Sequence, residues 1–324
     1  MPSLKEIKNR IASVQSTRKI TSAMKMVASS KLHHAQVMIE NMLPYENMLE
    51  TILKTYLAAD LDAQGALTQK REVKKVAMLV FASNSSLCGG FNANVIKMMQ
   101  RAVDGYKEKG IEVVVYPIGR KVAEKVGKLG IESAGNFAAL ADKPNSHECV
   151  QIGLGLADLF VKGEIDKVEM IYHHFKSAGS QILQTKTLIP IDIEEAMDYD
   201  HTRDLKNNVV TGNAQEYLEK QGGHKALEGQ SSSAKAKTLH DNYIVEPDRQ
   251  TVLNLLIPRY VNLMIYTALL DSNASEHAAR MVAMQTATDN ADELLRLLNL
   301  QYNKSRQQAI TSELLDIVGG SVNN

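Results

Sequence analysis

A glycine-rich turn is the first stretch of the sequence that could carry chemistry. Residues 83–90 read Ser-Asn-Ser-Ser-Leu-Cys-Gly-Gly and lie between a short apolar run and an amphipathic stretch. Such a turn can bind phosphate, because the backbone N–H groups at a helix N-terminus point toward an anion. The chain contains neither Gly-x-x-x-x-Gly-Lys-Ser/Thr nor Gly-x-Gly-x-x-Gly. The sequence therefore favours a structural or contact loop over a nucleotide site.

The histidines and cysteines show no spacing typical of metal ligands or of a nucleophile with its base. His33-His34 and His173-His174 are adjacent pairs, and adjacent side chains point to different sides of a helix or strand. Cys88 lies in the loop and is expected to be the more exposed thiol, whereas Cys149 lies in an apolar helix and is expected to be buried. Two cysteines without a disulfide framework favour a reducing cytosolic compartment. We therefore expect no catalytic residue, no cofactor and no metal.

The composition is that of an ordinary globular protein. Of 324 residues, 44% are hydrophobic and 23% are charged, which argues against disorder. The 37 basic and 37 acidic residues give no net field that would indicate nucleic acid. We expect no signal or transit peptide and no membrane span. The most apolar window, Val252–Leu270, contains Arg259, and a central Arg costs ~2.5–3.5 kcal/mol on insertion scales.

A heptad pattern dominates the C-terminal part of the chain. Alternating steps of three and four residues from Leu253 to Ser312 land mostly on apolar residues or alanine, without a change of register. A seam of this length is typical of a helix that supercoils with a partner. At ~1.5 Å per residue, some 70 residues would extend roughly 105 Å, beyond an ordinary domain core.

The N-terminal part supplies a matching helix from about Ser3 to Ala58. Ser3 and Glu6 have the spacing of a capping box, and a seam opens at Leu4, Ile7, Ile11 and Val14. After Arg18 the apolar positions shift to Ile20, Met24, Val27, Leu32, Ala35, Ile39 and Met42. The alternative is two separate surface helices, each covering a domain. Residues 1–40 carry a net charge of +5, which suits either a solvated face or an acidic protein partner.

Between these helices the pattern is that of strands alternating with helices, which predicts a small open sheet. Residues 76–81, 111–117, 167–175 and 181–189 are the expected strands, and residues 176–180 form the expected hairpin turn. The expected helices cover residues 92–109, 120–128 and 146–160. The predicted fold class is α/β, with a long antiparallel coiled coil of the N- and C-terminal helices plus a small Rossmann-like α/β domain.

Four segments follow from this pattern. They are an N-terminal coiled-coil helix (1–60), an α/β domain (73–192), a flexible insertion rich in Asn, Gly, Ser and Lys (198–242), and a C-terminal coiled-coil helix (247–319). The insertion has no sustained apolar period, which predicts mobility.

Three long motifs resemble a known family. Residues 5–28 (KEIKNRIASVQSTRKITSAMKMVA), 278–290 (AARMVAMQTATDN) and 302–311 (YNKSRQQAIT) look like the terminal helices of the gamma subunit of the rotary, F-type ATP synthase of bacteria. Residues 87–90 and the strand order extend the resemblance into the middle of the chain, and only 198–242 falls outside it. A generic coiled-coil scaffold would not need these motifs, and an α/β nucleotide enzyme would need a phosphate loop.

The resemblance implies a central rotor shaft without catalytic activity of its own. Its partners would be the alpha and beta subunits of the catalytic ring, the epsilon subunit and the c-subunit ring of the membrane sector, at the cytoplasmic face of the bacterial inner membrane. Membrane association would arise only through the complex. Proton-driven rotation would force the beta sites through different nucleotide affinities.

The resemblance also assigns contact residues. Those matching family positions that face the alpha and beta ring are Met24, Lys25, Leu87, Cys88, Arg280, Arg306, Gln307, Thr311 and Glu313. Those implied in contact with the membrane ring or epsilon are Tyr243, Ile244 and Glu246. Asn84, Ser85 and Ser86 stand where the family usually has Asp-Arg-Gly, so the loop lacks the charge that those positions would supply.

Overall fold

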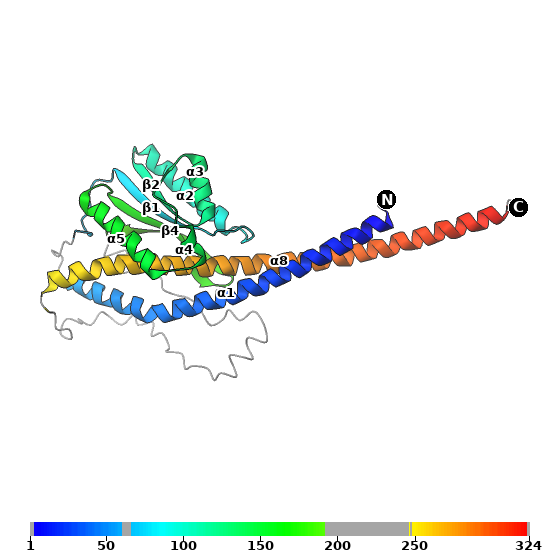
Figure 1. Cartoon of the computed structure of the whole chain (residues 1–324), viewed down its shortest axis with the longest axis horizontal. Helices are drawn as coiled ribbons and strands as arrows, with labels where there is room; N and C mark the ends of the chain where they lie inside the picture. The colour runs from blue at the N-terminus through cyan, green and yellow to red at the C-terminus, as the bar shows by residue number, and fades with distance from the viewer. Residues whose placement is uncertain (1–2, 60–65, 192–245, 247, 323–324) are drawn as a thin grey trace, which may run out of the picture. The chain divides into compact units, whose positions relative to one another are not determined.

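The computed structural model describes residues 3–59, 66–191, 246 and 248–322. The chain divides into two compact units. Unit 1 comprises Met1–Ser30 and Arg280–Asn324, and unit 2 comprises Lys31–Ala279. The helices α1 (Leu4–Ala59) and α8 (Arg249–Val322) each contribute to both units (Figure 1). The predicted insertion at 198–242 lies outside the described residues, as do Tyr243 and Ile244.

Unit 2 is built on a mixed five-stranded sheet of order β3-β2-β1-β4-β5. Neighbouring strands are parallel except for the antiparallel β4–β5 hairpin. The strands are β1 (Lys75–Phe81), β2 (Glu112–Ile118), β3 (Glu132–Ser133), β4 (Lys167–Ser177) and β5 (Ser180–Ile189). The helices between them are α2 (Phe91–Glu108), α3 (Arg120–Leu129), α4 (Ala138–Asp142) and α5 (Ser146–Lys162).

Strand β1 shows why this sheet needs helices on both faces. Its side chains alternate between two cores, with Leu79 and Phe81 in one and Met78 and Val80 in the other. The first core is closed by α5 and by the parts of α1 and α8 that belong to unit 2, and the second by α2 and α3 (Figure 1). An apolar run buried on both faces is what residues 76–81 predict, and the prediction is confirmed.

The predicted strands and helices of unit 2 are confirmed, with ends that differ by at most two residues. Two short elements, β3 and α4, were not predicted. β3 has only two residues, both exposed, and α4 has five. Neither is long enough to show an apolar period. The most apolar part of α8 satisfies the length and hydropathy of a membrane span, with mean hydropathy 1.3, but 56% of that window is buried inside the protein.

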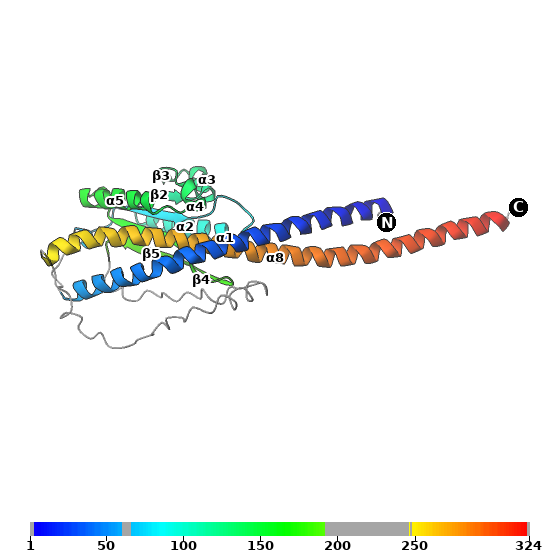
Figure 2. The ribbon, with the colours of Figure 1, turned by 60° about the horizontal axis from the view of Figure 1, so that its bottom comes forward.

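Unit 1 is an antiparallel pair formed by the N-terminal part of α1 and the C-terminal part of α8. Arg18 Nη1 contacts Asp292 Oδ1 at 2.9 Å, and the hydroxyls of Thr21 and Thr288 share a hydrogen bond of 2.8 Å. Residue numbers rise along α1 while they fall along α8, so the helices run in opposite directions. The beginning of α1 and the end of α8 lie at the same end of the pair in both views (Figures 1 and 2).

The seam predicted on α8 is confirmed from Leu253 to Ser305. Each of its positions in that range is buried or half-buried, whereas positions 309 and 312 are exposed. Asp248 caps this helix, because its Oδ1 accepts the Thr251 N–H at 2.8 Å. Ser3 caps α1 in the same way, with the Glu6 N–H at 3.2 Å from Ser3 Oγ.

The seam predicted on α1 is wrong between Arg18 and Ala28. Ile20 and Val27 are more than half exposed, and Met24 is 41% exposed. The positions that continue the three-four alternation from Leu4 are buried or half-buried instead: Arg18, Thr21, Lys25 and Ala28. The heptad register therefore continues unbroken, with polar residues at three of these four positions, while Ile20, Met24 and Val27 face outward.

Candidate partner-contact surfaces

The residues expected to face a partner in unit 1 lie mostly on its outer surface. Met24, Arg306, Gln307, Thr311 and Glu313 are exposed, whereas Lys25 and Arg280 are half-buried. Thr311 donates its hydroxyl to the Gln307 carbonyl at 2.9 Å. Lys25 occupies a seam position, which accounts for its partial burial. In unit 2, Glu246 is exposed.

Unit 1 also exposes apolar side chains that were not predicted as contact residues. They are spread over both helices rather than gathered in the seam: Ile20, Met26, Val27, Val282, Leu294, Leu297, Leu300, Ile310, Leu314 and Leu315. Single exposed apolar residues are common on soluble proteins. Ten of them lie on this one helix pair, which makes its outer surface a candidate for contact with another protein. They are found by asking which apolar residues lie outside the heptad register and are exposed; residue type alone does not distinguish them from seam residues.

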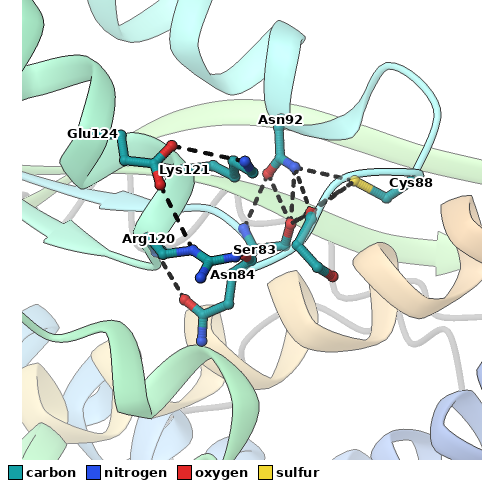
Figure 3. A network of polar contacts seen from close by, with 8 residues as sticks. Ser83, Asn84, Cys88, Asn92, Arg120, Lys121 and Glu124 are labelled. Carbon is teal, nitrogen blue, oxygen red and sulfur yellow. Dashed lines mark hydrogen bonds and ion pairs between the residues drawn. The ribbon is translucent and has the colours of Figure 1, made fainter.

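In unit 2 the loop 83–90 is held by hydrogen bonds centred on Asn92 (Figure 3). Asn92 Oδ1 accepts the Ser83 N–H at 3.0 Å, and Asn92 Nδ2 donates to the Ser85 carbonyl and to Cys88 Sγ, both at 3.1 Å. Cys88 is 1% exposed. Cys149 is 0% exposed, so both thiols are buried and the exposure expected of Cys88 is not found. The reason is that the loop folds inward at Cys88 so that its sulfur accepts from Asn92.

Asn84 ties the same loop to two other elements. Its Nδ2 donates to the Ala138 carbonyl and to Asp142 Oδ2 of α4, both at 2.7 Å. Its Oδ1 accepts the Arg120 N–H at 2.8 Å, and its carbonyl accepts from Arg120 Nη2 at 2.7 Å. The α3 N-cap, Gly119, has no side chain to fill this role. A Cβ at Gly119 would overlap the Ala82 carbonyl oxygen, so only glycine permits this approach.

Leu87 is the exposed point of the loop. Its side chain is 61% exposed, and its φ of 68° is the one positive value among the non-glycine residues that the structure describes. A non-glycine residue in this region is strained, and such strain persists only where the surroundings fix the backbone. Asn84, three residues before Leu87, and Cys88, directly after it, are both held by the hydrogen bonds to Asn92 and Arg120 described above. The loop therefore presents an apolar side chain from a rigid base.

The crevice at which an open α/β sheet would bind a nucleotide is filled. In such sheets ligands bind at the carboxyl ends of the strands where the order reverses, here β1 and β4. At that position the Phe91 ring stacks on His173, with centroids 4.4 Å apart and an interplanar angle of 24°. Ser83 is fully buried there. This packing supports the prediction of a structural or contact loop.

Three buried titratable groups of unit 2, His173, His174 and Cys149, are engaged in packing. Burial lowers the pKa of His173 to about 4, so this imidazole is neutral at neutral pH. His174 points to the other side of β4, where its Nδ1 lies 2.7 Å from Asp271 Oδ2. Burial, with a smaller effect of Glu148, raises the pKa of the Cys149 thiol to about 12, so it is unreactive at neutral pH. Among the described residues no group of three His, Cys, Asp or Glu side chains could hold a metal ion.

The chain is similar to known proteins of one family. Residues 3–322 match the family model described as ATP synthase. The ATP synthase gamma chain of Bacteroides thetaiotaomicron is 50% identical over 323 residues, covering 99% of this chain and all of its own. That of Flavobacterium johnsoniae is 40% identical over 323 residues, covering 99% of this chain and 98% of its own.

The chain belongs to the ATP synthase gamma chain family.

Solved structures of this family share the fold. A chain from the central stalk and c-ring of the Tetrahymena thermophila mitochondrial ATP synthase superposes with a TM-score of 0.54 at 22% identity, covering 83% of this chain and 99% of that one. A chain of the Euglena gracilis mitochondrial ATP synthase superposes with a TM-score of 0.57 at 17% identity, covering 98% and 93%. The predicted fold class is thereby confirmed. As a gamma chain, the protein is a subunit of the membrane-associated, rotary F-type ATP synthase.

Proposed function

We propose that this chain is the central rotor shaft of a proton-translocating ATP synthase. Rotation of the membrane ring turns the shaft, and the shaft forces the catalytic sites of the surrounding beta subunits through successive nucleotide affinities. In hydrolysis the same coupling runs in reverse. The observation that carries the proposal is the antiparallel helix pair of unit 1, formed by the two ends of one chain of this family.

The surface of this helix pair suits a shaft that turns against its partners. Its exposed apolar side chains alternate with polar ones such as Arg306 and Gln307. A broad apolar stripe would hold one angle, because burial stabilises by ~25 cal/mol per Å². Met24 on α1 and Leu297 on α8 are instead separate contacts that can form and break as the angle changes.

The chain itself is proposed to be non-catalytic. The loop 83–90 is closed on Asn92, and Phe91 fills the crevice beside it. The ATP sites then belong to the partner subunits, and the role of this chain is mechanical.

The partners follow from the same proposal. Unit 1 contacts the alpha and beta subunits through Met24, Lys25, Arg280, Arg306, Gln307, Thr311 and Glu313. Unit 2 contacts beta through the loop at Leu87, while Cys88, which is 1% exposed, supports the loop from within. The c-subunit ring and epsilon are contacted through Tyr243, Ile244 and Glu246. The complex lies at the cytoplasmic face of the bacterial inner membrane, and the chain reaches the membrane only through it.

Light-triggered crosslinking of unit 1 tests this role. Ile310 is 49% exposed, and both native cysteines are buried, so Ile310→Cys offers one accessible thiol for a photoreactive maleimide. The labelled complex should contain alpha and beta subunits and should hydrolyse ATP in the dark. Irradiation should attach the shaft to the ring and stop repeated turnover.

A control label and a purification make the outcome decisive. The same label, photolysed before it is added to the complex, should leave turnover unchanged after irradiation. Continued turnover at the dark rate in complexes shown by gel to be crosslinked would contradict a moving shaft. A generic scaffold role is excluded if alpha and beta subunits co-purify in fixed stoichiometry.

A further inference from the structure

Loop 83–90 lacks a charged side chain, but an arginine from another element is bound to it. Its eight residues are Ser, Asn, Leu, Cys and Gly only. The Arg120 guanidinium of α3 nonetheless reaches the loop, with Nη2 donating to the Asn84 carbonyl at 2.7 Å (Figure 3). Arg120 thus lies at the base of the loop, 36 residues away in sequence.

Arg120 has donors left for a partner. A guanidinium carries five N–H groups. Nη2 contacts Asn84, and Nε lies 3.7 Å from Glu124 Oε1. The side chain is 60% exposed. Nη1 has no partner among the residues that the structure describes. Because Leu87 follows Asn84 by three residues, the two lie within roughly 11 Å along the chain.

We propose that Arg120 supplies the positive charge of the contact surface that Leu87 completes, and that Asn84 positions it. The surface combines an apolar side chain with an arginine fork at one edge. It fits a protein surface that offers an apolar recess beside a carboxylate, because a guanidinium pairs with a carboxylate through two parallel hydrogen bonds. The inference rests on the proposed function, in which that surface belongs to a subunit of the ring.

Asn84 positions Arg120 by holding the first turn of α3. Its Oδ1 accepts the Arg120 N–H, while its Nδ2 is anchored on Ala138 and Asp142. An aspartate at position 84 could accept from Arg120 but could not donate to α4. It would also place a second carboxylate beside Asp142. The amide of Asn84 is therefore required at this position, and a carboxylate would not replace it.

The simpler alternative is that Arg120 is a solvated residue of α3. Its contact with Glu124 is a surface i,i+4 pair, and such pairs contribute little. On this alternative, removing the charge costs at most the bond to the Asn84 carbonyl and leaves the turnover of the complex unchanged. A contact residue and a solvated residue differ in their effect on the rate of ATP hydrolysis by the assembled complex, so the complex is what is measured.

The first experiment removes the charge. The complex is purified with wild-type chain, Arg120→Gln, or the control Arg101→Gln, which removes an exposed arginine of α2. Arg120→Gln should assemble with alpha and beta but hydrolyse ATP roughly threefold to tenfold more slowly at low salt. Arg101→Gln should match the wild type. At about 0.5 M salt the difference should shrink, because exposed charges are screened. Equal rates for the two variants at low salt would show that Arg120 is only solvated.

The second experiment tests the positioning role. Asn84→Asp should slow turnover at neutral pH, because the introduced carboxylate and that of Asp142 repel each other. Acidification should reduce the defect, since two adjacent carboxylates share a proton more readily and a protonated carboxyl can donate. Asn84→Asp combined with Asp142→Asn restores the donor and should recover turnover at neutral pH. A defect that is unchanged by pH and not rescued would overturn the positioning role.

The proposed function and this inference fail in different ways. If wild-type chain does not co-purify with alpha and beta, the proposed function is wrong. If it does, and Arg120→Gln behaves as wild type, only the role of Arg120 is wrong. Thermal unfolding of each variant chain verifies that unit 2 remains folded, so a change in turnover reports the contact surface.

Discussion

Helix α8 is buried in two different ways along its length. In unit 2 most side chains from Tyr260 to Ala278 are buried on every side of the helix. In unit 1 only the seam positions are buried, among them Met281, Met284, Ala291, Leu295 and Leu298. One continuous helix is therefore a core element in unit 2 and half of a two-stranded seam in unit 1. Its local stability depends on what surrounds it, rather than on its own sequence propensity.

The difference predicts unequal stability. Unit 2 buries its helices against a sheet that is covered on both faces, whereas unit 1 buries a narrow seam that includes Arg18, Thr21 and Lys25. Local opening free energies are lowest where few apolar contacts are made. Unit 1 should therefore open without unit 2.

Truncating a core side chain should lower the unfolding free energy of unit 2 more than truncating a seam side chain lowers that of unit 1. Leu79→Ala, at a fully buried position of β1, should reduce the unfolding free energy of unit 2 by about 2–5 kcal/mol. Leu298→Ala, in the seam, should cost less, because the helices can relax toward each other. Hydrogen exchange during urea unfolding measures both. A larger loss of unfolding free energy for Leu298→Ala than for Leu79→Ala would contradict the lower stability expected of unit 1.

A pH dependence confined to unit 2 is the next largest effect. His173 has a pKa of about 4 in the folded chain and about 6.5 when unfolded. The unfolded state therefore binds more protons between these values. The stabilisation is complete above pH 6.5 and is lost as the pH falls toward 4, by about 3 kcal/mol at most. His173→Phe keeps a ring on Phe91 and should flatten this dependence. Unit 1 should show none of it, as measured by hydrogen exchange against pH.

A smaller effect is expected at the outer face of unit 1. Arg306 is exposed beside the seam residue Ser305. Arg306→Ala should leave the complex assembled but should slow ATP hydrolysis and synthesis together by several-fold, about 1 kcal/mol. Turnover at the wild-type rate in the purified mutant complex would instead support a solvated side chain.

The smallest effect concerns the polar layer in the seam. Arg18 and Asp292 are 43% and 52% exposed, so their coupling should be no more than about 0–1 kcal/mol and should fall with salt. A double-mutant cycle of Arg18→Gln and Asp292→Asn measures it. A coupling well above this range would show that the layer, and not the apolar seam, stabilises unit 1.

Features that depend on periodicity could be predicted from the sequence. The seam of α8 and the strands of unit 2 repeat over enough residues for the pattern to exceed local variation. The α1 seam after Arg18 could not be predicted from apolar residue type, because polar residues occupy the register there. Continuing the three-four alternation from Val14 reaches Thr21 and Lys25, so register is the better guide in this helix.

The contact loop could be predicted only in part. The absence of a phosphate motif disfavours a nucleotide site, and this stays a prediction. The burial of Cys88 and the approach of Arg120 depend on partners supplied by α2 and α3, which come together only when β1 and β2 pair. No short-range pattern contains that information. The contact residues assigned by resemblance stay a prediction.

Direct observation of rotation tests whether this chain turns inside the ring. Gln151 is exposed on α5, and both native cysteines are buried, so Gln151→Cys accepts a single fluorescent label. With the ring immobilised through its alpha or beta subunits, ATP should drive the label through repeated turns in one direction. Rotation should stop when ATP is removed. A label that keeps a fixed angle while the same complexes hydrolyse ATP would contradict the role of this chain as the rotor shaft.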